Sequence, residues 1–295
     1  MTRIVLGSMG FIGEALYDRL KAKGIDAYPI PTSGGSEYSL DKDYEWLYPL
    51  IENVDVLYLC AGSTGGVGRM ANDPLSFVYP NVRIHMNVFE ACAKMGVKRV
   101  VVLNSTTGYP DSSDPMHEDQ YLTGEPHPAY YGPGNAHRFI YRLAKLFPKV
   151  EFVFFRPSNV YGPGNNFDPQ TSHVIEATVR KVAERQEPFV IWSDGKATRD
   201  AIYIDDLVEA MTYDCPPGAY NIGTGEEMSV VQMVNVLFDH ADFHPEIQFD
   251  LTKPSAIPAR RVDISKALSF GWTPKVSMTE GLQRTFDYYI GRDRG

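Results

Sequence analysis

Short apolar runs alternate with longer amphipathic stretches through the first half of the chain. Apolar runs bounded by polar residues or glycine predict five strands, at Arg3–Leu6, Ala27–Ile30, Val54–Cys60, Arg99–Leu103 and Glu151–Phe155. The stretches between them have helical periodicity and predict helices at Phe11–Lys23, Asp43–Ile51, Pro74–Met95 and Asn135–Phe147. Strands that are apolar throughout and separated by helices predict an α/β fold, a Rossmann-type doubly wound parallel sheet covered on both faces.

The pattern loosens after Pro157, where Gly, Pro and Asn residues cluster. One further helix is expected at Val174–Glu184, and an apolar segment returns at Ala201–Asp206. We therefore expect a main domain of residues 1–157 with about 198–222, and a smaller, discontinuous C-terminal lobe. The smaller lobe comprises residues of about 158–197 and 223–295. A ligand is expected between the two parts.

Composition limits the partners and the compartment. The 295 residues are 43% hydrophobic and carry a formal net charge of −9, which argues against a surface for nucleic acid or anionic membranes. Because no apolar run is long enough to span a membrane and the N-terminus leads directly into a strand pattern, a cytoplasmic protein is expected. Cys60, Cys92 and Cys215 have neither metal nor redox spacing, so no metal site is expected.

A glycine-rich turn directly follows the first predicted strand and opens the first helix, with the sequence Gly7-Ser8-Met9-Gly10-Phe11-Ile12-Gly13. The first glycine permits a tight turn, the second lets a pyrophosphate approach the backbone, and the third allows close packing of helix on strand. The N-terminus of the helix then faces the phosphates. Because position and spacing agree, the turn predicts dinucleotide binding through Gly7, Gly10, Phe11, Ile12 and Gly13.

The segment after the second strand bears on which dinucleotide is bound. NAD enzymes usually place an Asp or Glu there to contact the adenosine ribose. This chain has Pro31-Thr32-Ser33-Gly34-Gly35, without an acid or an arginine. Hydroxyls and backbone amides, among them those of Thr32, are able to donate to a phosphate, so NADP is favoured over NAD.

The second half carries the most informative motif, Asn159-Val160-Tyr161-Gly162-Pro163-Gly164-Asn165-Asn166-Phe167-Asp168-Pro169, which closes with Ser172-His173-Val174-Ile175. Further motifs are Gly65-Gly66-Val67, Ala71-Asn72-Asp73-Pro74, Asn104–Pro110, Arg199–Asp206, Tyr220–Gly225, and Lys253-Pro254 followed by Arg260 and Asp263. Over nearly its whole length the chain resembles the extended short-chain dehydrogenase/reductase family. The block from Asn165 to His173 points to the GDP-fucose synthase branch of that family.

The resemblance implies catalytic roles for three residues. Ser105 matches the serine that hydrogen-bonds the 4-hydroxyl or 4-keto oxygen of the sugar, and a hydroxyl is suited to donate to an oxygen that gains negative charge. His173 matches the histidine that acts as an acid in carbon epimerisation. Thr107 stands where this branch has a cysteine acid/base. Because a threonine hydroxyl is far less acidic than a thiol, double epimerisation at carbons three and five is in doubt.

The same resemblance implies contacts with cofactor and substrate. Cofactor contacts beyond the glycine turn are expected at Asp41, Ala61, Gly62, His137 and Pro157. Substrate contacts are expected at Asn159, Asn165, Trp192, Arg199 and Arg260. The planar guanidinium of Arg199 suits bidentate recognition of the diphosphate, and Arg260 with Lys253 would add positive charge. Trp192 is expected on the nucleotide side of the smaller lobe.

The Tyr-x-x-x-Lys pair of the family is absent from this chain. If Tyr131 is the tyrosine, Asn135 stands at the lysine; if His137 stands at the lysine, Pro133 stands at the tyrosine. Neither residue reproduces a permanent ammonium, so activation of the tyrosine should be weaker. The second register is preferred because it places one apolar helical face on Phe139, Ile140, Leu143, Ala144 and Phe147.

These features predict a nucleotide-sugar epimerase/reductase, with GDP favoured as the nucleotide, acting at or next to C4 with a bound nicotinamide dinucleotide. Ser105 would polarise the 4-oxygen, His173 would be the acid or base, and Tyr130 or Tyr131, with Tyr131 as first choice, would donate a proton. Two alternatives stay open, a redox-independent epimerase of a 4-keto nucleotide sugar and a non-catalytic dinucleotide-binding sensor. The resemblance also implies a homodimer, formed through the helices predicted at Pro74–Met95 and Asn135–Phe147.

Overall fold

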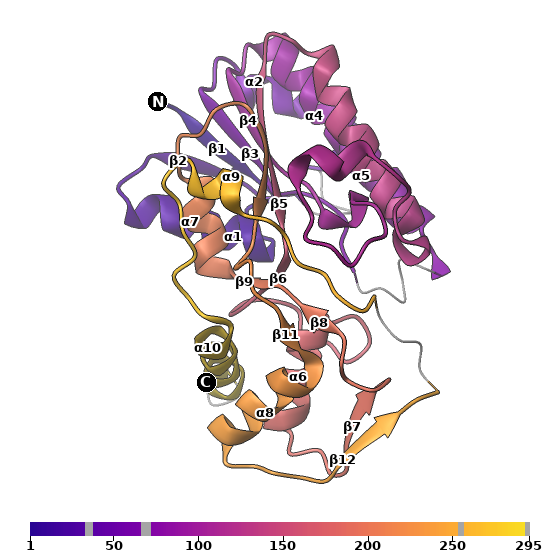
Figure 1. Ribbon diagram of the computed structural model, residues 1–295. Helices are drawn as coiled ribbons and strands as arrows, with labels where there is room; N and C mark the ends of the chain where they lie inside the picture. Colours follow the sequence, from indigo (N-terminus) through magenta and orange to yellow (C-terminus); the bar gives the residue numbers. More distant parts are fainter. Residues whose placement is uncertain (33–37, 66–71, 253–256, 293–295) are drawn as a thin grey trace.

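A six-stranded parallel sheet, ordered β10-β5-β4-β3-β1-β2, is the centre of the computed structural model (Figure 1). The structure describes residues 1–32, 38–65, 72–252 and 257–292. The strands are β1 (Arg3–Leu6), β2 (Ala27–Ile30), β3 (Val56–Leu59), β4 (Arg99–Leu103), β5 (Glu151–Pro157) and β10 (Gly218–Ile222). All five predicted strands are present, and the predicted Rossmann-type fold is confirmed. The sixth, β10, lies in a segment for which no strand was predicted.

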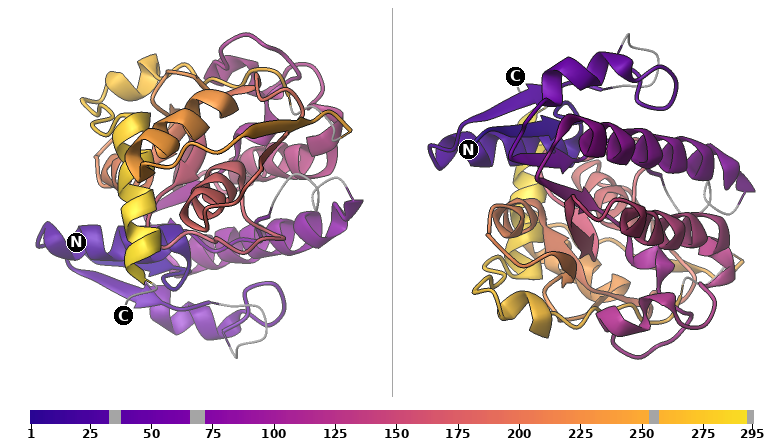
Figure 2. Two further views of the ribbon diagram at one scale, coloured as in Figure 1. Left: turned by 90° about the horizontal axis from the view of Figure 1, so that it is seen from below. Right: turned by 90° about the horizontal axis from the view of Figure 1, so that it is seen from above.

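Helices cover both faces of the sheet, as Figures 1 and 2 show. One face carries α1 (Phe11–Ala22) and α7 (Ile204–Met211); the other carries α2 (Tyr48–Ile51), α4 (Leu75–Met95) and α5 (Tyr131–Leu143). Within β1, Val5 belongs to the apolar cluster that includes α1, whereas Ile4 and Leu6 belong to the cluster that includes α4. Because alternate residues of a strand point to opposite faces, burial of both faces requires strands that are apolar throughout.

Two helices differ from the sequence prediction. Helix α5 begins at Tyr131, four residues before the predicted start, and the chain continues after Leu143 as a 3₁₀ turn, η5 (Ala144–Leu146). The predicted apolar face is correct for Ile140 and Leu143 but wrong for Phe139, which is 47% exposed. A helix turns by about 100° per residue, so Phe139 points away from the sheet when Ile140 points toward it. The segment expected as one helix at 43–51 is a 3₁₀ turn, η1 (Glu45–Leu47), followed by α2.

The smaller lobe follows β5, at the carboxyl ends of the parallel strands (Figure 1). Its helices α6 (Val174–Ala183), α8 (Val230–Ala241) and α10 (Met278–Arg292) pack against one another. Two strand pairs complete it: β7 (Phe189–Trp192) is parallel to β12 (Ile247–Asp250), and β8 (Thr198–Arg199) is antiparallel to β11 (Met228–Ser229). This lobe therefore adds its side chains to the edge of the sheet where the glycine turn lies.

The chain crosses between the two parts more than once. The predicted segment Ala201–Asp206 does not enter the main sheet, because β9 (Ala201–Tyr203) pairs with β6 (Asn159–Tyr161) in a separate two-stranded sheet. Helix α7 then packs on α1, and β10 joins the main sheet beside β5. Helix α9 (Ser265–Leu268) also packs against β10, although its residues fall in the range expected for the smaller lobe. The proposed domain boundaries stay a prediction.

Several predicted motif residues lie outside the described residues, namely Ser33-Gly34-Gly35, Gly66-Val67, Ala71 and Lys253-Pro254. Within the described ranges, no helix is both long enough and apolar enough to cross a membrane. In the same ranges, His, Cys, Asp and Glu side chains do not gather in groups of three or more that would hold a metal ion.

Packing of α10 on β6 leaves no space for a side chain at Gly281. A Cβ added there would lie 2.0 Å from the hydroxyl oxygen of Tyr161, which is itself buried. We expect Gly281→Ala to lower stability by about 2 kcal/mol through overpacking, measured by thermal and urea unfolding.

Gly291 is a matched control on the same helix, because an added Cβ meets no atom within 4 Å among the described residues. Gly291→Ala should be neutral or stabilise by up to about 1 kcal/mol through helix propensity. Equal effects of the two substitutions would contradict the packing argument. Tyr161→Phe in the Gly281→Ala background should recover part of the loss, because it removes the contacting oxygen.

Candidate active site

The glycine turn forms a tight cradle at the start of α1. Gly7 has a left-handed φ of +87°, and a Cβ at that position would lie 2.6 Å from the amide nitrogen of Ala61. A Cβ at Gly13 would lie 2.1 Å from the carbonyl oxygen of Gly7. The N-cap residue, Gly10, offers no side-chain hydrogen bond to the first turn of α1. The backbone amides of that turn are therefore available to a bound anion, and the cradle fits a pyrophosphate. Phe11 and Ile12 follow it, half-buried against the core.

The ends of β2 and β3 supply the neighbouring surface. Thr32 Oγ1 is buried without a hydrogen-bond partner among the described residues, which leaves it available to a ligand. Asp41 accepts a hydrogen bond from the Ser39 hydroxyl. After β3, the turn at Gly62 is held by Asn81 of α4. The Asn81 side chain accepts from the Ser63 amide and donates to the Ser63 carbonyl, both at 3.0 Å. Sequence reasoning missed Asn81, for which the signal was a polar residue on the buried face of an amphipathic helix.

Ser105 lies two residues beyond the end of β4 and is hydrogen-bonded to Thr107. The two side-chain oxygens are 2.8 Å apart, and the Thr107 amide donates to Ser105 Oγ at 3.1 Å. The Ser105 amide donates to the side chain of Asn104 at 2.7 Å. The Thr107 amide occupies one lone pair of Ser105 Oγ, and in the contact between the two hydroxyls either oxygen is able to donate. Thr107 therefore acts on Ser105 in this structure, and the two predicted residues do lie together.

An arginine buried behind Ser105 was not foreseen from the sequence. The guanidinium carbon of Arg156, a fully buried residue of β5, lies 3.5 Å from the ring centre of Tyr121. The Tyr121 hydroxyl is 2.9 Å from Asn104 Oδ1 and 3.0 Å from the Ser105 carbonyl oxygen. Arg156 also donates to the Tyr109 hydroxyl at 3.2 Å. Burial raises the pKa of Tyr109 to about 12 and raises that of Tyr121 as well, so both tyrosines stay protonated and donate.

The two adjacent tyrosines at the start of α5 lie in different surroundings. Tyr131 is the first residue of the helix and is 57% exposed. Tyr130 ends the 3₁₀ turn η4 (Pro128–Tyr130), with its ring centre 5.1 Å from the Arg260 guanidinium. Arg260 in turn donates to the Thr106 carbonyl at 2.6 Å, next to Ser105. The structure therefore places Tyr130 beside Arg260 near the end of β4, while Tyr131 as the proton donor stays a prediction.

Arg199 and Arg260 form a positive pair on the smaller lobe. Arg199 donates to the Ile257 carbonyl at 2.7 Å and to the Thr198 carbonyl, and neither arginine has a carboxylate in ion-pair contact among the described residues. Burial lowers the pKa of both, and the Arg199 charge lowers that of Arg260 further. An arginine stays charged at neutral pH, so two unneutralised guanidiniums fit a diphosphate.

The signature loop of residues 159–169 lies against the glycine turn. A Cβ on Gly164 would be 3.7 Å from the Phe11 ring. Asn165 does not face outward, because its side chain donates to Glu176 Oε1 of α6 at 2.6 Å. His173 precedes α6 and is exposed, although the protein atoms around it lower its pKa by desolvation. Of the other predicted contacts, Pro157 is half-buried at the end of β5 and Asn159 is exposed at the start of β6. Trp192 is exposed at the end of β7, within the smaller lobe.

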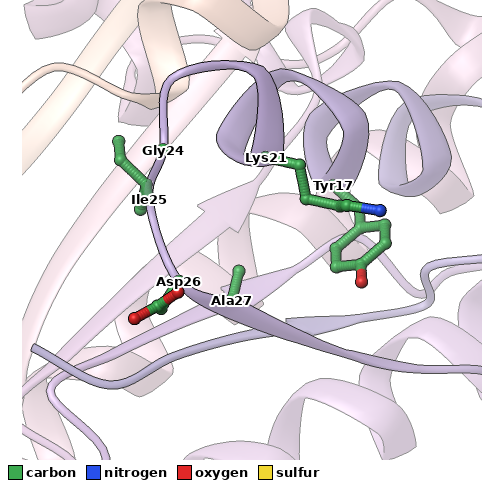
Figure 3. Close-up of a pocket in the computed structure, with 6 residues that line it drawn as sticks. All are labelled: Tyr17, Lys21, Gly24, Ile25, Asp26 and Ala27. Carbon is green, nitrogen blue, oxygen red and sulfur yellow. The ribbon is translucent and has the colours of Figure 1, made fainter.

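A surface hollow at the other end of α1 is separate from these residues. Figure 3 shows it between Tyr17 and Lys21 of α1 and the segment Gly24–Ala27, which leads into β2. Helix α1 starts at the glycine turn, and Tyr17 and Lys21 follow its first residue by six and ten positions, so at about 1.5 Å per residue they lie roughly 9 to 15 Å along the helix from that turn. Because ligands of open α/β sheets bind at the carboxyl ends of the strands, this hollow is on the wrong side for the predicted site.

Comparison with known proteins agrees with this arrangement. The profile of the NAD dependent epimerase/dehydratase family matches residues 3–223. The chain belongs to that family, and the resemblance inferred from the sequence is confirmed.

Individual relatives match nearly the whole chain. GDP-L-fucose synthase 1 of Arabidopsis thaliana is 30% identical, over 97% of this chain and 92% of that protein. A GDP-L-fucose synthetase from Naegleria fowleri, solved bound to NADP, is 21% identical and covers 99% of this chain and 93% of its own, with a TM-score of 0.88. A GDP-6-OMe-4-keto-L-xylo-heptose reductase from C. jejuni has the same identity and TM-score, over 99% and 98%. At this identity the two solved structures show a shared fold.

The Glu176 carboxyl that holds Asn165 makes stability depend on pH. Burial raises its pKa from 4.5 to about 7, and its Oε2 has no partner among the described residues. The carboxyl ionises near pH 4.5 when the chain is unfolded, so its contribution is complete below that pH and is lost as pH rises through 7. A shift of this size corresponds to roughly 3 kcal/mol. Glu176→Gln cannot ionise and should therefore be more stable than the native protein by about that amount near pH 8.

The measurement is urea unfolding of both proteins at several pH values between about 5 and 8. Glu184→Gln is the control, since Glu184 follows the same helix, is exposed and pairs with Arg180. Its stability difference should change little across the range. A pH-independent difference for Glu176→Gln would contradict the assignment.

Proposed function

We propose that the protein is a nucleotide-sugar epimerase/reductase that acts at or next to C4 of a GDP-linked sugar, with bound NADP favoured over NAD. The observation that carries this proposal is the Ser105–Thr107 hydroxyl pair at the end of β4. It lies on the same sheet edge as the glycine cradle and within reach of Arg260, which bonds Thr106. Relatives named GDP-L-fucose synthase and, at 25% identity over 98% of both chains, GDP-L-colitose synthase of Yersinia pseudotuberculosis support the substrate class.

The residues for the cofactor fit a nicotinamide dinucleotide. Gly7, Gly10 and Gly13 would hold its pyrophosphate on the N-terminus of α1. Thr32 and Asp41 would meet the adenosine side, where the unpartnered Thr32 hydroxyl suits a phosphate. Contacts on the nicotinamide side would come from Ala61, Gly62, Pro157 and His137. The bound dinucleotide supplies or removes a hydride at the sugar carbon.

On the substrate side, Ser105 donates its proton to the 4-oxygen of the sugar. The Thr107 amide and hydroxyl fix the Ser105 side chain, and Tyr121 with Asn104 fix its backbone. These donors are positioned before the substrate arrives, which is the condition for stabilising a developing oxyanion. Because Thr107 replaces a thiol acid/base, this site favours chemistry at C4 over double epimerisation at the neighbouring carbons.

Proton donation at C4 is assigned to Tyr130. A phenolate formed there would face the Arg260 guanidinium, which supplies positive charge where the family has a lysine. Arg199 and Arg260 would bind the diphosphate, and Asn159 and Trp192 would meet the nucleotide. His173, exposed at the start of α6, would exchange a proton at a carbon next to the ketone. Asn165 would shape the loop through Glu176 rather than touch substrate.

The direct test is to add a GDP-linked 4-keto-6-deoxy sugar and NADPH to the protein and to identify the product by NMR. Stoichiometric loss of NADPH with reduction at C4 is the expected result. Deuterium incorporation next to the ketone from heavy water, without consumption of NADPH, would favour the redox-independent epimerase instead. Binding of neither NADPH nor NADP⁺ would overturn the proposal.

Paired substitutions separate the two tyrosines. Tyr130→Phe should lower kcat by about 100-fold or more, because it removes a general acid. Tyr131→Phe should change kcat by less than about threefold, since that side chain is largely exposed. Both rates are measured at saturating NADPH, with thermal unfolding to confirm the fold. The reverse ranking would restore Tyr131 as the proton donor.

The proposed assembly is a homodimer through α4 and α5. The two helices pack side by side on one side of the molecule (Figure 2). Their outer surface carries exposed apolar side chains at Leu75, Tyr79, Met86, Tyr131 and Phe139. Several exposed apolar side chains on paired helices support burial against a second copy.

Light scattering with size-exclusion chromatography tests the dimer. Tyr79→Glu should produce a monomer, because it would bury a charge in the proposed interface. Tyr28→Glu is the control, since Tyr28 and Tyr79 are both 61% exposed. Tyr28 lies on β2, the edge strand of the main sheet, and not on either helix of the proposed interface. Loss of the dimer in both variants, or in neither, would argue against this surface.

A further inference from the structure

The turn that carries Ser105 and Thr107 has little structure of its own. It is a single 3₁₀ turn, η2 (Thr106–Gly108), with Ser105 as its N-cap residue and an extended residue, Tyr109, after it. Its backbone hydrogen bonds run from the Tyr109 amide to the Thr106 carbonyl at 3.1 Å and from the Gly108 amide to the Ser105 carbonyl at 3.5 Å. Because so short a turn is weakly held by its own backbone, its position depends on contacts from other segments.

Arg138 of α5 supplies one of these contacts and has no role in the chemistry proposed so far. The side chain is 8% exposed, and each of its three nitrogens donates to a backbone carbonyl. Nε donates to Gly108 at 2.6 Å, Nη1 to Gly124 at 2.7 Å and Nη2 to Thr123 at 2.8 Å. In the described part of the chain no carboxylate lies within ion-pair distance of this guanidinium. Its planar fork therefore holds backbone in place rather than pairing with a charge.

The carbonyls that Arg138 binds belong to two segments that meet at Ser105. Gly108 ends η2, whereas Thr123 and Gly124 directly follow the 3₁₀ turn η3 (Glu118–Leu122). Within η3, the Tyr121 hydroxyl donates to the Ser105 carbonyl at 3.0 Å. Arg138 thus holds the Gly108 end of the turn directly, and the segment to which it also binds holds the Ser105 end.

Helix α5 also touches this turn through its backbone. Gly134 lies one helical turn before Arg138, and a Cβ added to it would lie 2.5 Å from the carbonyl oxygen of Thr107. The contacted atom is backbone, so a side chain at Gly134 would displace the turn itself. On the strand side, Asn104 donates to the His137 carbonyl of the same helix at 3.4 Å. The helix therefore determines where the turn lies.

We propose that Arg138 is a positioning residue for the Ser105–Thr107 hydroxyl pair, which it holds through the Gly108 carbonyl while Gly134 lets the turn approach α5. Since its three nitrogens donate to backbone carbonyls, Arg138 acts on the sugar through the turn. A displacement of about 1 Å is enough to weaken donation to the 4-oxygen, because preorganised donors act over short distances. The inference rests on the proposed function, which supplies the 4-oxygen.

Kinetics of a conservative substitution test this role. Arg138→Lys keeps the charge, but an ammonium lacks the planar fork that reaches three carbonyls. With the GDP-linked 4-keto-6-deoxy sugar and saturating NADPH, kcat should fall by about tenfold or more, while KM for the sugar and Kd for NADPH stay within about threefold. Loss of stability alone would not produce this split at a temperature where the variant is fully folded.

Arg142→Lys is the matched control, because Arg142 lies one turn later on the same helix and is exposed. Its kcat should equal that of the native protein. An unchanged kcat for Arg138→Lys would overturn the inference, and so would equal losses in the two variants.

Hydrogen–deuterium exchange tests the same contact without turnover. In Arg138→Lys, the peptide that spans residues 104–110 should exchange at least about threefold faster than in the native protein or in Arg142→Lys. A peptide from α1 should exchange at the native rate. Faster exchange along the whole chain would indicate a general structural role and overturn the inference.

Gly134→Ala is the second variant and decides the inference if Arg138→Lys does not fold. The added Cβ displaces the Thr107 carbonyl, so kcat should fall by about tenfold with KM unchanged. A native kcat in this variant would overturn the inference. If the native protein does not reduce the GDP-linked sugar, the proposed function fails, and the exchange data still decide whether Arg138 holds the turn. Turnover that is insensitive to Arg138→Lys overturns this inference alone.

Discussion

A permanent positive charge buried behind the end of β4 organises the site. The Arg156 guanidinium stacks on the ring of Tyr121 and donates to the hydroxyl of Tyr109. Each of these tyrosines in turn donates a hydrogen bond to a neighbouring asparagine. Tyr121 reaches Asn104 and the Ser105 carbonyl, while Tyr109 reaches Asn221 of β10. The faces of Tyr109, Tyr121 and Tyr141 stabilise this buried charge, while its Nε and Nη2 have no hydrogen-bond partner among the described residues. Arg156 is therefore connected, through these tyrosines, both to Ser105 and to Asn221 of β10.

The charges at this edge differ from those of the molecule as a whole. The chain has a formal net charge of −9, yet Arg156, Arg199 and Arg260 all lie near the end of β4 or beside it on the smaller lobe. Burial keeps these guanidiniums from being screened by water, so their field acts on a bound anion more strongly than surface charges would. Helices α4 and α5 instead bury two neutral imidazoles, those of His85 and His137. Positive charge is thus concentrated on the substrate side of the edge.

This distribution bears on the missing Tyr-x-x-x-Lys pair. The sequence reasoning looked for a cation within the same helix, one turn from a tyrosine. In the structure a cation beside the Tyr130 ring is Arg260, which comes from a segment far along the chain and also bonds Thr106. Thr107, in the place of a thiol, bonds the Ser105 hydroxyl. The departures from the family pattern are therefore concentrated in one place and are compatible with proton donation at a single carbon.

The fold of the first half could be predicted because its signals are local. Strands buried on both faces must be apolar throughout, and the glycines at 7 and 13 are required by contacts of a few ångströms within the turn and with Ala61. Ser105 could also be predicted, because polar residues just after a parallel strand lie at the edge of the sheet where ligands bind. Shorter pieces such as β7, β8, β11 and β12 escaped prediction, because two-residue to four-residue strands have little periodicity of their own.

Tertiary structure decided which side chains face the site. Tyr130 and Tyr131 are adjacent in sequence, but Tyr130 ends a 3₁₀ turn beside Arg260 whereas Tyr131 begins α5. Only packing fixes where that helix begins. Asn165 turned inward because Glu176 of α6 offered an acceptor in a buried place. Arg156 and Tyr121 come from separate elements, and no local pattern encodes their contact. The sequence by itself determined the sheet, the cradle and the family, since these depend on burial and backbone geometry over short stretches. The orientation of the catalytic groups was decided by contacts between distant segments, which exist only once the core has packed.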